Sequence, residues 1–351
     1  MATGAKHRWI SWLLLSVSLL LFVRMARTAQ LSEVLALLRA RGPILALSLW
    51  PYLLVLCLDA AGWRTLLSTL GRNVGPWRVF WVRTSTEAIH RSLPGGAVAA
   101  EAMKPYLLRE SAGVPISETT ASLAMSKVLT VATQSLYIAF ASAIAFARLG
   151  SSPLAWISLL TALFLAAVTV AGAFLMGHGA VAEKLYRVIH RIPLPRLRSW
   201  IEEKERAFLD TDQHSTELFR ARKRQLAKCA VLFLAAWLAE SLDSWISLRL
   251  LGVRVSYANV LSFDSLVSLI RSLAFFLPGA LGVQDLSYMA FLRAFGIADD
   301  TNLVMAFVLL KRAKEVFWIL TGLIALVTIQ NLRRSPAARI EASGEIPNPK
   351  C

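Results

Sequence analysis

The sequence predicts an all-α polytopic membrane protein with about six full spans and two re-entrant hairpins of broken helices in an inverted repeat. Apolar residues make up 56% of its 351 residues, and the mean hydropathy is +0.56. Several apolar runs reach the ~20 residues that a helix needs to cross the bilayer core. Two further stretches of similar sequence are partly apolar but broken by Pro-Gly, which is the pattern of a discontinuous helix.

Six apolar runs are long enough to span a membrane. They lie at about 9–26, 43–63, 121–148, 153–177, 229–251 and 303–330. The first run follows Lys6 and Arg8 and is followed by Arg24 and Arg27 instead of a small-residue cleavage site. We therefore expect a retained signal-anchor helix and not a cleaved signal peptide.

Basic residues predict the orientation of the chain. The net charge is +16, but Lys and Arg flank apolar runs, which favours contact with anionic lipid and excludes nucleic acid as the expected partner. Residues 178–228 hold twelve Lys or Arg against seven Asp or Glu. Such a loop stays in the cytoplasm. We expect a bacterial inner-membrane protein with both termini cytoplasmic and with the turns at 149–152 and 299–302 outside.

These features divide the chain into five parts. They are an N-terminal signal-anchor helix and linker (1–42), a first membrane repeat (43–177), the basic cytoplasmic loop (178–228), a second membrane repeat (229–330) and a polar C-terminal tail (331–351).

The two broken stretches, 76–110 and 256–298, share one motif. The first reads Leu93-Pro94-Gly95-Gly96 with Glu101 and Arg109, and the second reads Leu277-Pro278-Gly279-Ala280 with Asp285 and Arg293. The offset is 184 residues throughout, and it also aligns Lys127 with Lys311 and Asp59 with Asp243. The predicted topology inverts one copy relative to the other, as in transporters whose site lies at the repeat interface.

A half-helix that starts after Pro94 or Pro278 would present free N–H groups to a phosphate or carboxylate. The alternative is a simple kink at which Gly allows two helices to approach closely. On the functional interpretation, the candidate substrate-binding residues are Arg91, Pro94, Gly95, Gly96, Glu101, Arg109, Lys127, Pro278, Gly279, Asp285, Arg293 and Lys311.

Each charged candidate has a structural and a functional interpretation. Burying the carboxylates of Glu101 and Asp285 at membrane depth costs free energy unless they are paired or hydrated. A structural ion pair is therefore slightly favoured over proton coupling or contact with a cationic head group. Lys127 and Lys311 either snorkel to the interface or bind an anionic head group in a cavity. Lys311 also shares a helix face with Glu315, which predicts partial self-pairing.

Three further acids, Asp59, Glu240 and Asp243, lie near the ends of their predicted spans. We interpret them as ordinary interface residues. No nucleophile–base set, Walker A motif or metal-ligand spacing occurs, and Cys57, Cys229 and Cys351 are scattered. We therefore expect no enzymatic activity, no cofactor and no metal site.

Several motifs resemble those of a known family. They are Leu93-Pro94-Gly95-Gly96 with Glu101, the run from Leu277 to Asp285, and the run from Phe291 to Ile297. Over most of residues 45–330 the chain resembles the flippase-like family named for the transmembrane region of lysylphosphatidylglycerol synthases, in particular its hopanoid-associated branch. The chain departs from the family at residues 97–100, where a Gly-rich turn is usual, and at Gln284-Asp285, where Arg-Glu is common.

The resemblance implies a lipid flippase or transporter that moves a phospho- or isoprenoid-type lipid with an anionic head group. Full synthases add a soluble aminoacyl-transferase domain, for which the roughly twenty residues after the last span are too few. We therefore do not expect this chain to make aminoacyl-lipids alone. The alternative is a membrane protein partner that regulates a lipid-synthesising enzyme through the basic loop. A hydrated cavity between the hairpins would favour transport, whereas hairpins that pack against each other without water would favour the regulator.

Overall fold

A computed structural model of the chain describes residues 31–93, 95–177, 213–215, 217–218, 223–274 and 277–334. In these residues the secondary structure is helical and contains no strand, which confirms the predicted all-α class. The predicted first span at 9–26, the polar tail after residue 334 and most of the basic loop lie outside the described residues.

The described helices follow the predicted order of spans and hairpins. They are α2 (Leu31–Arg41), the 3-10 helix η1 (Gly42–Leu49), α3 (Trp50–Thr69), α4 (Pro76–Ser92), α5 (Gly96–Ala112), α6 (Ile116–Leu149), α7 (Pro153–Gly177), α10 (Lys223–Leu250), α11 (Tyr257–Leu273), the 3-10 turn η2 (Pro278–Ala280), α12 (Val283–Ala294) and α13 (Thr301–Arg334).

Four segments among the described residues are long and apolar enough to cross a membrane. They are Ser32–Thr69, Ile116–Arg148, Pro153–Phe174 and Lys223–Leu250. The helix predicted at 303–330 is present as α13, which has 34 residues and is therefore about 51 Å long. It is not among these four segments, and it carries several charges in its first half.

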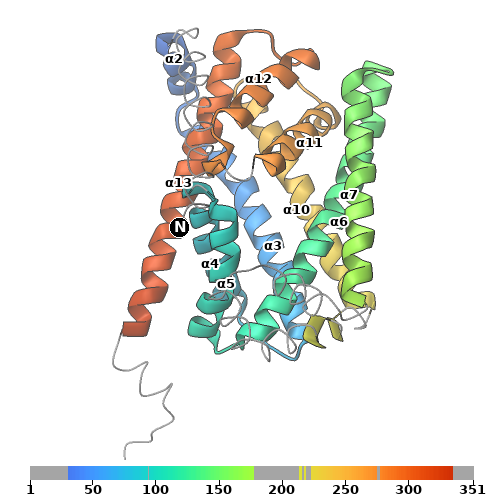
Figure 1. The fold of residues 1–351 in the computed structure, drawn as a ribbon. Helices are drawn as coiled ribbons and strands as arrows, with labels where there is room; N and C mark the ends of the chain where they lie inside the picture. The colour runs from blue at the N-terminus through green and yellow to red at the C-terminus, as the bar shows by residue number, and fades with distance from the viewer. Residues whose placement is uncertain are drawn as a thin grey trace, which may run out of the picture.

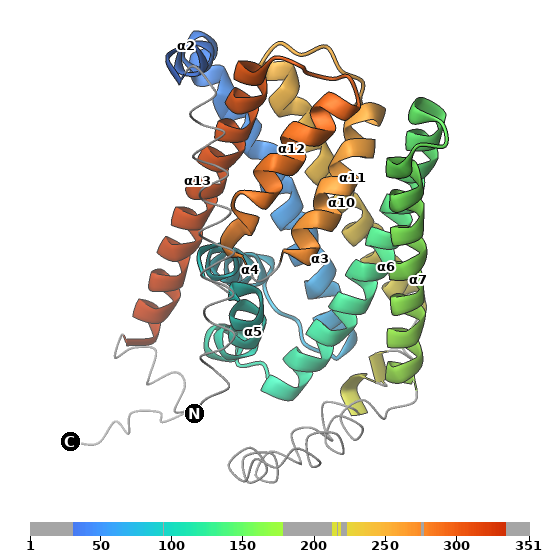
Figure 2. The ribbon, with the colours of Figure 1, turned by 45° about the horizontal axis from the view of Figure 1, so that its top comes forward.

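The helices form one bundle in which α3 packs against α10 at the centre (Figures 1 and 2). The α6–α7 pair lies along one side of the bundle and α13 along the other. The hairpin of α4 and α5 occupies the lower half in both views, and the hairpin of α11 and α12 occupies the upper half. Two short hairpins from opposite ends therefore fill the space between the long helices.

Both helix breaks occur at the predicted Pro-Gly sequences. Gly95, between α4 and α5, has φ +67°, and Gly279 and Gly282, before α12, have φ +53° and +77°. Glycine adopts these left-handed conformations without the steric cost of a Cβ atom. With 17 residues, α4, α5 and α11 are each about 25 Å long, which is less than the ~30 Å hydrocarbon core.

Local sequence signals fix where the hairpins begin. Pro76 is the first residue of α4, where its missing N–H and fixed φ are tolerated. The N-cap of α11 is Ser256, whose hydroxyl accepts a hydrogen bond from the Asn259 backbone N–H at 3.3 Å. Each hairpin thus starts at a residue that favours a helix N-terminus.

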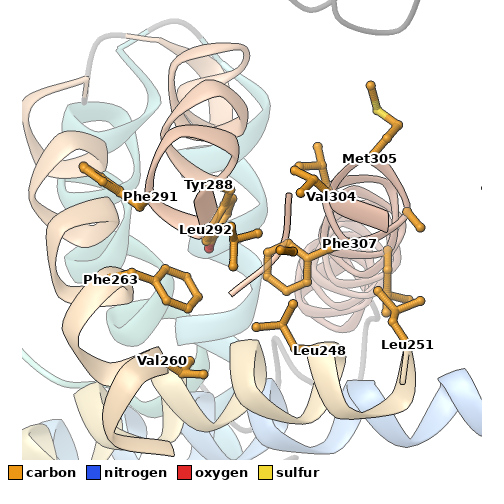
Figure 3. Packing of buried hydrophobic residues seen from close by; sticks show 14 of the residues in the cluster. Leu248, Leu251, Val260, Phe263, Tyr288, Phe291, Leu292, Val304, Met305 and Phe307 are labelled. Atoms are coloured by element: carbon orange, nitrogen blue, oxygen red, sulfur yellow. The ribbon is translucent and has the colours of Figure 1, made fainter. Parts of the chain in front are cut away.

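The largest apolar cluster joins the second hairpin to the long helices (Figure 3). Phe263 of α11 and Phe307 of α13 lie on either side of Tyr288 of α12, with ring centroids 6.4 and 5.1 Å from the Tyr288 ring. Leu248 of α10 is completely buried in the same cluster. These contacts hold α12 between α11 and α13 and so fix the position of the second break.

The outer faces of α7 and α13 are apolar and exposed. The exposed side chains include Leu160, Leu163, Phe164, Val168 and Val170 on α7, and Val316, Leu320, Ile324 and Val327 on α13. Contiguous apolar surface of this kind needs an apolar environment. Together with the four long apolar segments, it supports a membrane-embedded protein.

Close packing of α13 on α4 generates a stability prediction. A Cβ atom at Gly322 would lie 2.4 Å from the Thr84 carbonyl oxygen, whereas one at Gly172 would meet only Val128 at 3.4 Å. We expect Gly322→Ala to destabilise the fold by about 1–3 kcal/mol, because overpacked backbone must move. Gly172→Ala, also in a helix, should be neutral or stabilising. Thermal unfolding in detergent measures both, and equal melting temperatures would contradict the predicted contact.

Candidate functional site

The two helix breaks border one large cavity. Its volume is about 360 Å³. We call it the main cleft, and its walls include Ala97 and Ala100 after the first break, Leu277 and Gly279 at the second break, and Trp237 of α10. The breaks place backbone instead of bulky side chains at this position, which leaves room for a ligand between the hairpins.

Charged side chains cover much of the main cleft. Five basic and four acidic residues line it, and they are Arg83, Arg91, Lys104, Lys127, Arg271, Asp59, Glu87, Glu101 and Glu240. The sum is +1, so the cleft is close to neutral with a basic excess. A set of charges like this inside an apolar bundle is stable only if the charges are paired or hydrated.

The cleft opens to the surface near the first hairpin. The side chains of Lys127, His90 and Glu101 are 56%, 47% and 35% exposed. In contrast, the Arg91 side chain is only 16% exposed. Charge is therefore accessible at the mouth of the cleft and becomes buried toward its inner end.

A second, smaller cavity lies beyond this inner end. Its volume is about 40 Å³. Tyr52, Arg91, Glu240 and Arg271 line both cavities and form the wall between them. We call the smaller cavity the inner chamber, and its remaining lining residues are Asp243, Gln284, Tyr288, Lys311, Lys314, Glu315 and Trp318.

Arg91 is the hub of this wall. Its guanidinium donates to Glu87 at 2.7 Å, to Glu315 of α13 at 3.0 Å and to the Tyr52 hydroxyl of α3 at 2.9 Å. It also lies over the Tyr52 ring, 5.2 Å from the centroid. One side chain thus connects α4 to a helix from each half of the chain.

Two further residues of α4 extend the ion-pair network around Arg91. Arg83, Glu87 and Arg91 follow one another at intervals of four residues, so they share one helix face. Arg83 donates to Asp59 of α3 at 3.0 Å and also binds Glu87. Deeper in the same cleft, Arg271 of α11 binds Glu240 of α10. These pairs compensate the charges that the cleft buries.

Glu101 lies at the mouth of the cleft between two lysines. Its carboxylate accepts from Lys104 at 2.8 Å and contacts Lys127 at 2.6 Å. The Lys104 side chain is 8% exposed and the Lys127 side chain 56% exposed. Of the two lysines, Lys127 is therefore the one that an incoming ligand can reach.

Hydrogen bonds from Arg312 of α13 stabilise the second break. Its guanidinium binds the Asp285 carboxylate through two nitrogens, at 2.9 and 3.0 Å, and the Gly279 carbonyl at 3.0 Å. Asp285 in turn accepts from the Gly282 backbone N–H at 3.0 Å, at the start of α12. Arg312 also binds Glu315, which connects the break to the Arg91 hub.

Next to the inner chamber, Asp243 of α10 binds two lysines of α13. Lys311 lies at 2.6 Å and Lys314 at 2.8 Å, and Lys314 also donates to Ser247 at 2.7 Å. All three charged side chains are at least 88% buried. Within the described residues, no group of three or more His, Cys, Asp or Glu is placed to hold a metal ion.

The structure brings some of the predicted site residues together. Arg91, Glu101, Lys127 and Gly279 line the main cleft, and Lys311 lines the inner chamber. The Asp285 carboxylate binds Arg312 and caps α12 instead of lining either cavity. Both acids thus have the basic partners that the structural interpretation expected.

The remaining predicted residues lie apart from the cavities. Arg109 is exposed in the last turn of α5, and Arg293 is exposed near the end of α12, where it donates to Thr301 at 2.9 Å. Gly95 and Gly96 shape the first break, since a Cβ atom at Gly96 would lie 2.4 Å from the Ile89 carbonyl oxygen. Pro278 begins η2, and Pro94 lies outside the described residues.

Two predictions about charges were wrong. Asp243 and Glu240 are not ordinary residues, because their side chains are largely buried in the bundle and bind Lys311 and Arg271. Lys311 does not pair with Glu315 on its own helix. Glu315 instead binds Arg91 and Arg312, because the neighbouring helix offers a guanidinium at bonding distance.

Sequence reasoning missed several residues of the site. They are Tyr52, Arg83, Glu87, Arg271 and Lys314. One signal could have identified part of this set, because Arg83, Glu87 and Arg91 recur on one face of a partly apolar helix. Tyr52 and Arg271 carry no such signal, since their role depends on which helices meet.

Asp243 generates a second stability prediction. Asp243→Asn leaves Lys311 and Lys314 buried without their carboxylate, and we expect a loss of about 3–5 kcal/mol. Replacing all three by apolar residues (Asp243→Leu, Lys311→Met, Lys314→Met) should restore most of this loss, because no uncompensated charge remains. Unfolding in detergent measures both, with Asp299→Asn in an exposed turn as the matched control. An unchanged melting temperature for Asp243→Asn would contradict the predicted pairing.

The sequence of the chain matches one family of known proteins. Residues 9–325 match the sequence model of one family, described as the lysylphosphatidylglycerol synthase TM region. Neither the curated proteins nor the solved structures gave a match. The match covers both hairpins, the long helices except the last part of α13, and every residue that lines the two cavities. The chain therefore belongs to the family of lysylphosphatidylglycerol synthase transmembrane regions, a membrane protein family linked to lipid handling.

Proposed function

We propose that the protein is an inner-membrane flippase or transporter that carries an amphipathic lipid with an anionic head group. One observation carries this proposal: a large charged cleft lies where two broken hairpins meet, inside a bundle whose outer faces are apolar. A head group in the cleft would be solvated by polar side chains while its tails remain in the bilayer. That arrangement lowers the cost of moving a charge through hydrocarbon.

The order of helices supports a transport architecture. The helices α3 to α6 recur in the same order as α10 to α13, and the hairpin helices begin and end 181 to 187 residues apart. The two hairpins lie at opposite ends of the bundle (Figure 2). Both features fit an inverted repeat with its site at the repeat interface, as in many transporters.

The cleft favours transport over the alternative of a non-transporting regulator. Hairpins that only support a partner would pack against each other without a cavity, whereas a cavity of about 360 Å³ lies between them here. The proposal needs no covalent step. Each acidic residue that lines the cleft has a basic partner in the fold, so none is left as a free catalytic base.

Lys127 is the residue best placed to meet the head group. Its exposed ammonium can form a charge-assisted hydrogen bond to a phosphate, and such bonds contribute about 1.5–3 kcal/mol. Lys104 continues to neutralise Glu101 if Lys127 is removed. A change at Lys127 therefore tests ligand contact with little effect on folding.

We expect Lys127→Gln to lower the translocation of an anionic fluorescent lipid about tenfold in liposomes that contain the purified protein. Its melting temperature should stay close to that of the unmodified chain. Arg109→Gln also removes an exposed cation from the first hairpin region, but outside the cleft, and should leave the rate unchanged. Equal rates for Lys127→Gln and Arg109→Gln, or no translocation of any lipid by the unmodified protein, would reject the proposal.

The proposed inversion generates a topological prediction. The loop before α4 and the loop before α11 should face opposite sides of the membrane. Single cysteines at the exposed positions Asn73 and Arg254, with the three native cysteines replaced by serine, would report this. We expect an impermeant thiol reagent to label Arg254→Cys from outside intact cells and Asn73→Cys only after permeabilisation. Labelling of both from the same side would rule out the inverted arrangement.

A further inference from the structure

Asp264 of α11 is a buried acid that forms no ion pair with any of the described residues. It is 4% exposed, and its carboxylate accepts hydrogen bonds from two serines of α10, Ser244 at 2.8 Å and Ser241 at 3.3 Å. Other acids with little exposure each bind a Lys or Arg at no more than 3.0 Å, and they are Glu87, Glu118, Glu240, Asp243, Asp285 and Glu315. Asp264 therefore lacks the compensation that these acids have.

An ionised carboxylate in these surroundings is costly, because hydroxyl groups do not neutralise its charge. The free energy is lower when Asp264 holds a proton and is neutral. Its serine partners suit both forms, since a hydroxyl donates to a carboxylate and accepts from a protonated acid. A Lys or Arg partner can only donate, which would keep the acid in its ionised form.

The other ionisable groups around Asp264 act on it through space. They are Tyr137 of α6, Glu240 of α10, Tyr257 and Arg271 of α11, Tyr288 of α12, and Lys311 and Lys314 of α13. The remaining neighbour, α7, carries no ionisable residue. The Tyr137 hydroxyl lies 2.7 Å from that of Ser241, which extends the hydrogen-bonded chain from Asp264 to α6. Glu240 and Arg271 bind each other, so the lysines of α13 are the cations left to act on Asp264.

The lysines of α13 can compensate Asp264 when it loses its proton. Asp243 binds both Lys311 and Lys314, so these three groups carry one positive charge in excess. An ionised Asp264 would draw Lys311 toward α11 and leave Lys314 on Asp243. Both protonation states are therefore accessible. The change would also transfer one contact of α13 from α10 to α11, so the proton decides which helices are held together.

We propose that Asp264 is a proton-binding site that couples the movement of protons across the membrane to the movement of lipid. The proton comes from water on one side and returns to water on the other, so the carboxyl group gains and loses one proton in each cycle and no other bond changes. This proposal rests on the proposed transport function and adds its energy source. It assigns proton coupling to Asp264 instead of Glu101 or Asp285, since both of those acids have basic partners at no more than 3.0 Å.

Infrared spectroscopy of the full chain in detergent tests for the bound proton without any transport step. A protonated carboxyl group has a carbonyl stretching band that ionised carboxylates lack. We expect the unmodified protein to show this band at neutral pH and Asp264→Asn to lose it. Asp299→Asn, in an exposed turn, should keep the band. The melting temperature of Asp264→Asn should not fall, because asparagine is neutral and has nearly the shape of the protonated acid.

Liposomes that contain the purified protein test the coupling. If one proton moves with each lipid, a pH difference of about one unit shifts the distribution of an anionic fluorescent lipid between the two leaflets up to about tenfold. We expect this shift for the unmodified protein and for Asp299→Asn, and no shift for Asp264→Asn. An ionophore that removes the pH difference should abolish the shift.

Absence of the band, or a marked fall in the melting temperature of Asp264→Asn, would indicate an ionised carboxylate and overturn the proposal. If sodium chloride, but not choline chloride, stabilises the unmodified protein and not Asp264→Asn, the site binds a metal cation and the proposal is also overturned. Lipid movement that does not respond to the pH difference would overturn the coupling and leave the proposed function intact. If the band is present but no lipid moves, the proposed function fails and the proton site remains.

Discussion

The structure depends on compensation of the charges that the bundle buries, and the Arg91 guanidinium is the centre of that compensation. It joins Glu87 on its own helix to Tyr52 of α3 and Glu315 of α13. A buried charge that loses its partner costs about 3–5 kcal/mol, a large fraction of the stability of an ordinary domain. The ion pairs therefore fix how the two halves meet, although each pair adds little stability beyond an apolar equivalent.

The broken hairpins explain why these charges gather in one place. Glycines with positive φ at both breaks end one helix and start another within the bundle, so short helices replace full spans there. Non-helical backbone at such depth must be buried in protein or line a cavity. Here Arg312 satisfies the Gly279 carbonyl, Asp285 accepts from the Gly282 N–H, and Leu277 and Ala280 border the main cleft.

The two cavities differ in how accessible their charges are. Lys127 is exposed at the mouth of the main cleft, whereas Arg91 at its inner end is largely buried. The inner chamber beyond Arg91 is much smaller, and most of its lining side chains are charged and bind one another. Charge is therefore accessible at the mouth of the cleft and compensated by ion pairs at its inner end.

Hydropathy and the Pro-Gly motifs act on the local backbone, so the amino-acid sequence alone was sufficient to predict the helical class, four of the apolar spans and the position of both breaks. It also indicated Arg91 and Glu101, which flank the first break, and Lys127, which the repeat offset aligns with Lys311. The partners of these charges, in contrast, depend on how the helices pack. Asp243 pairs with Lys311 and Lys314, 68 and 71 residues away, and Arg109 and Arg293 lie outside the cavities. Local patterns contain no information on which helices become neighbours, and side-chain reach across helices selects each ion pair.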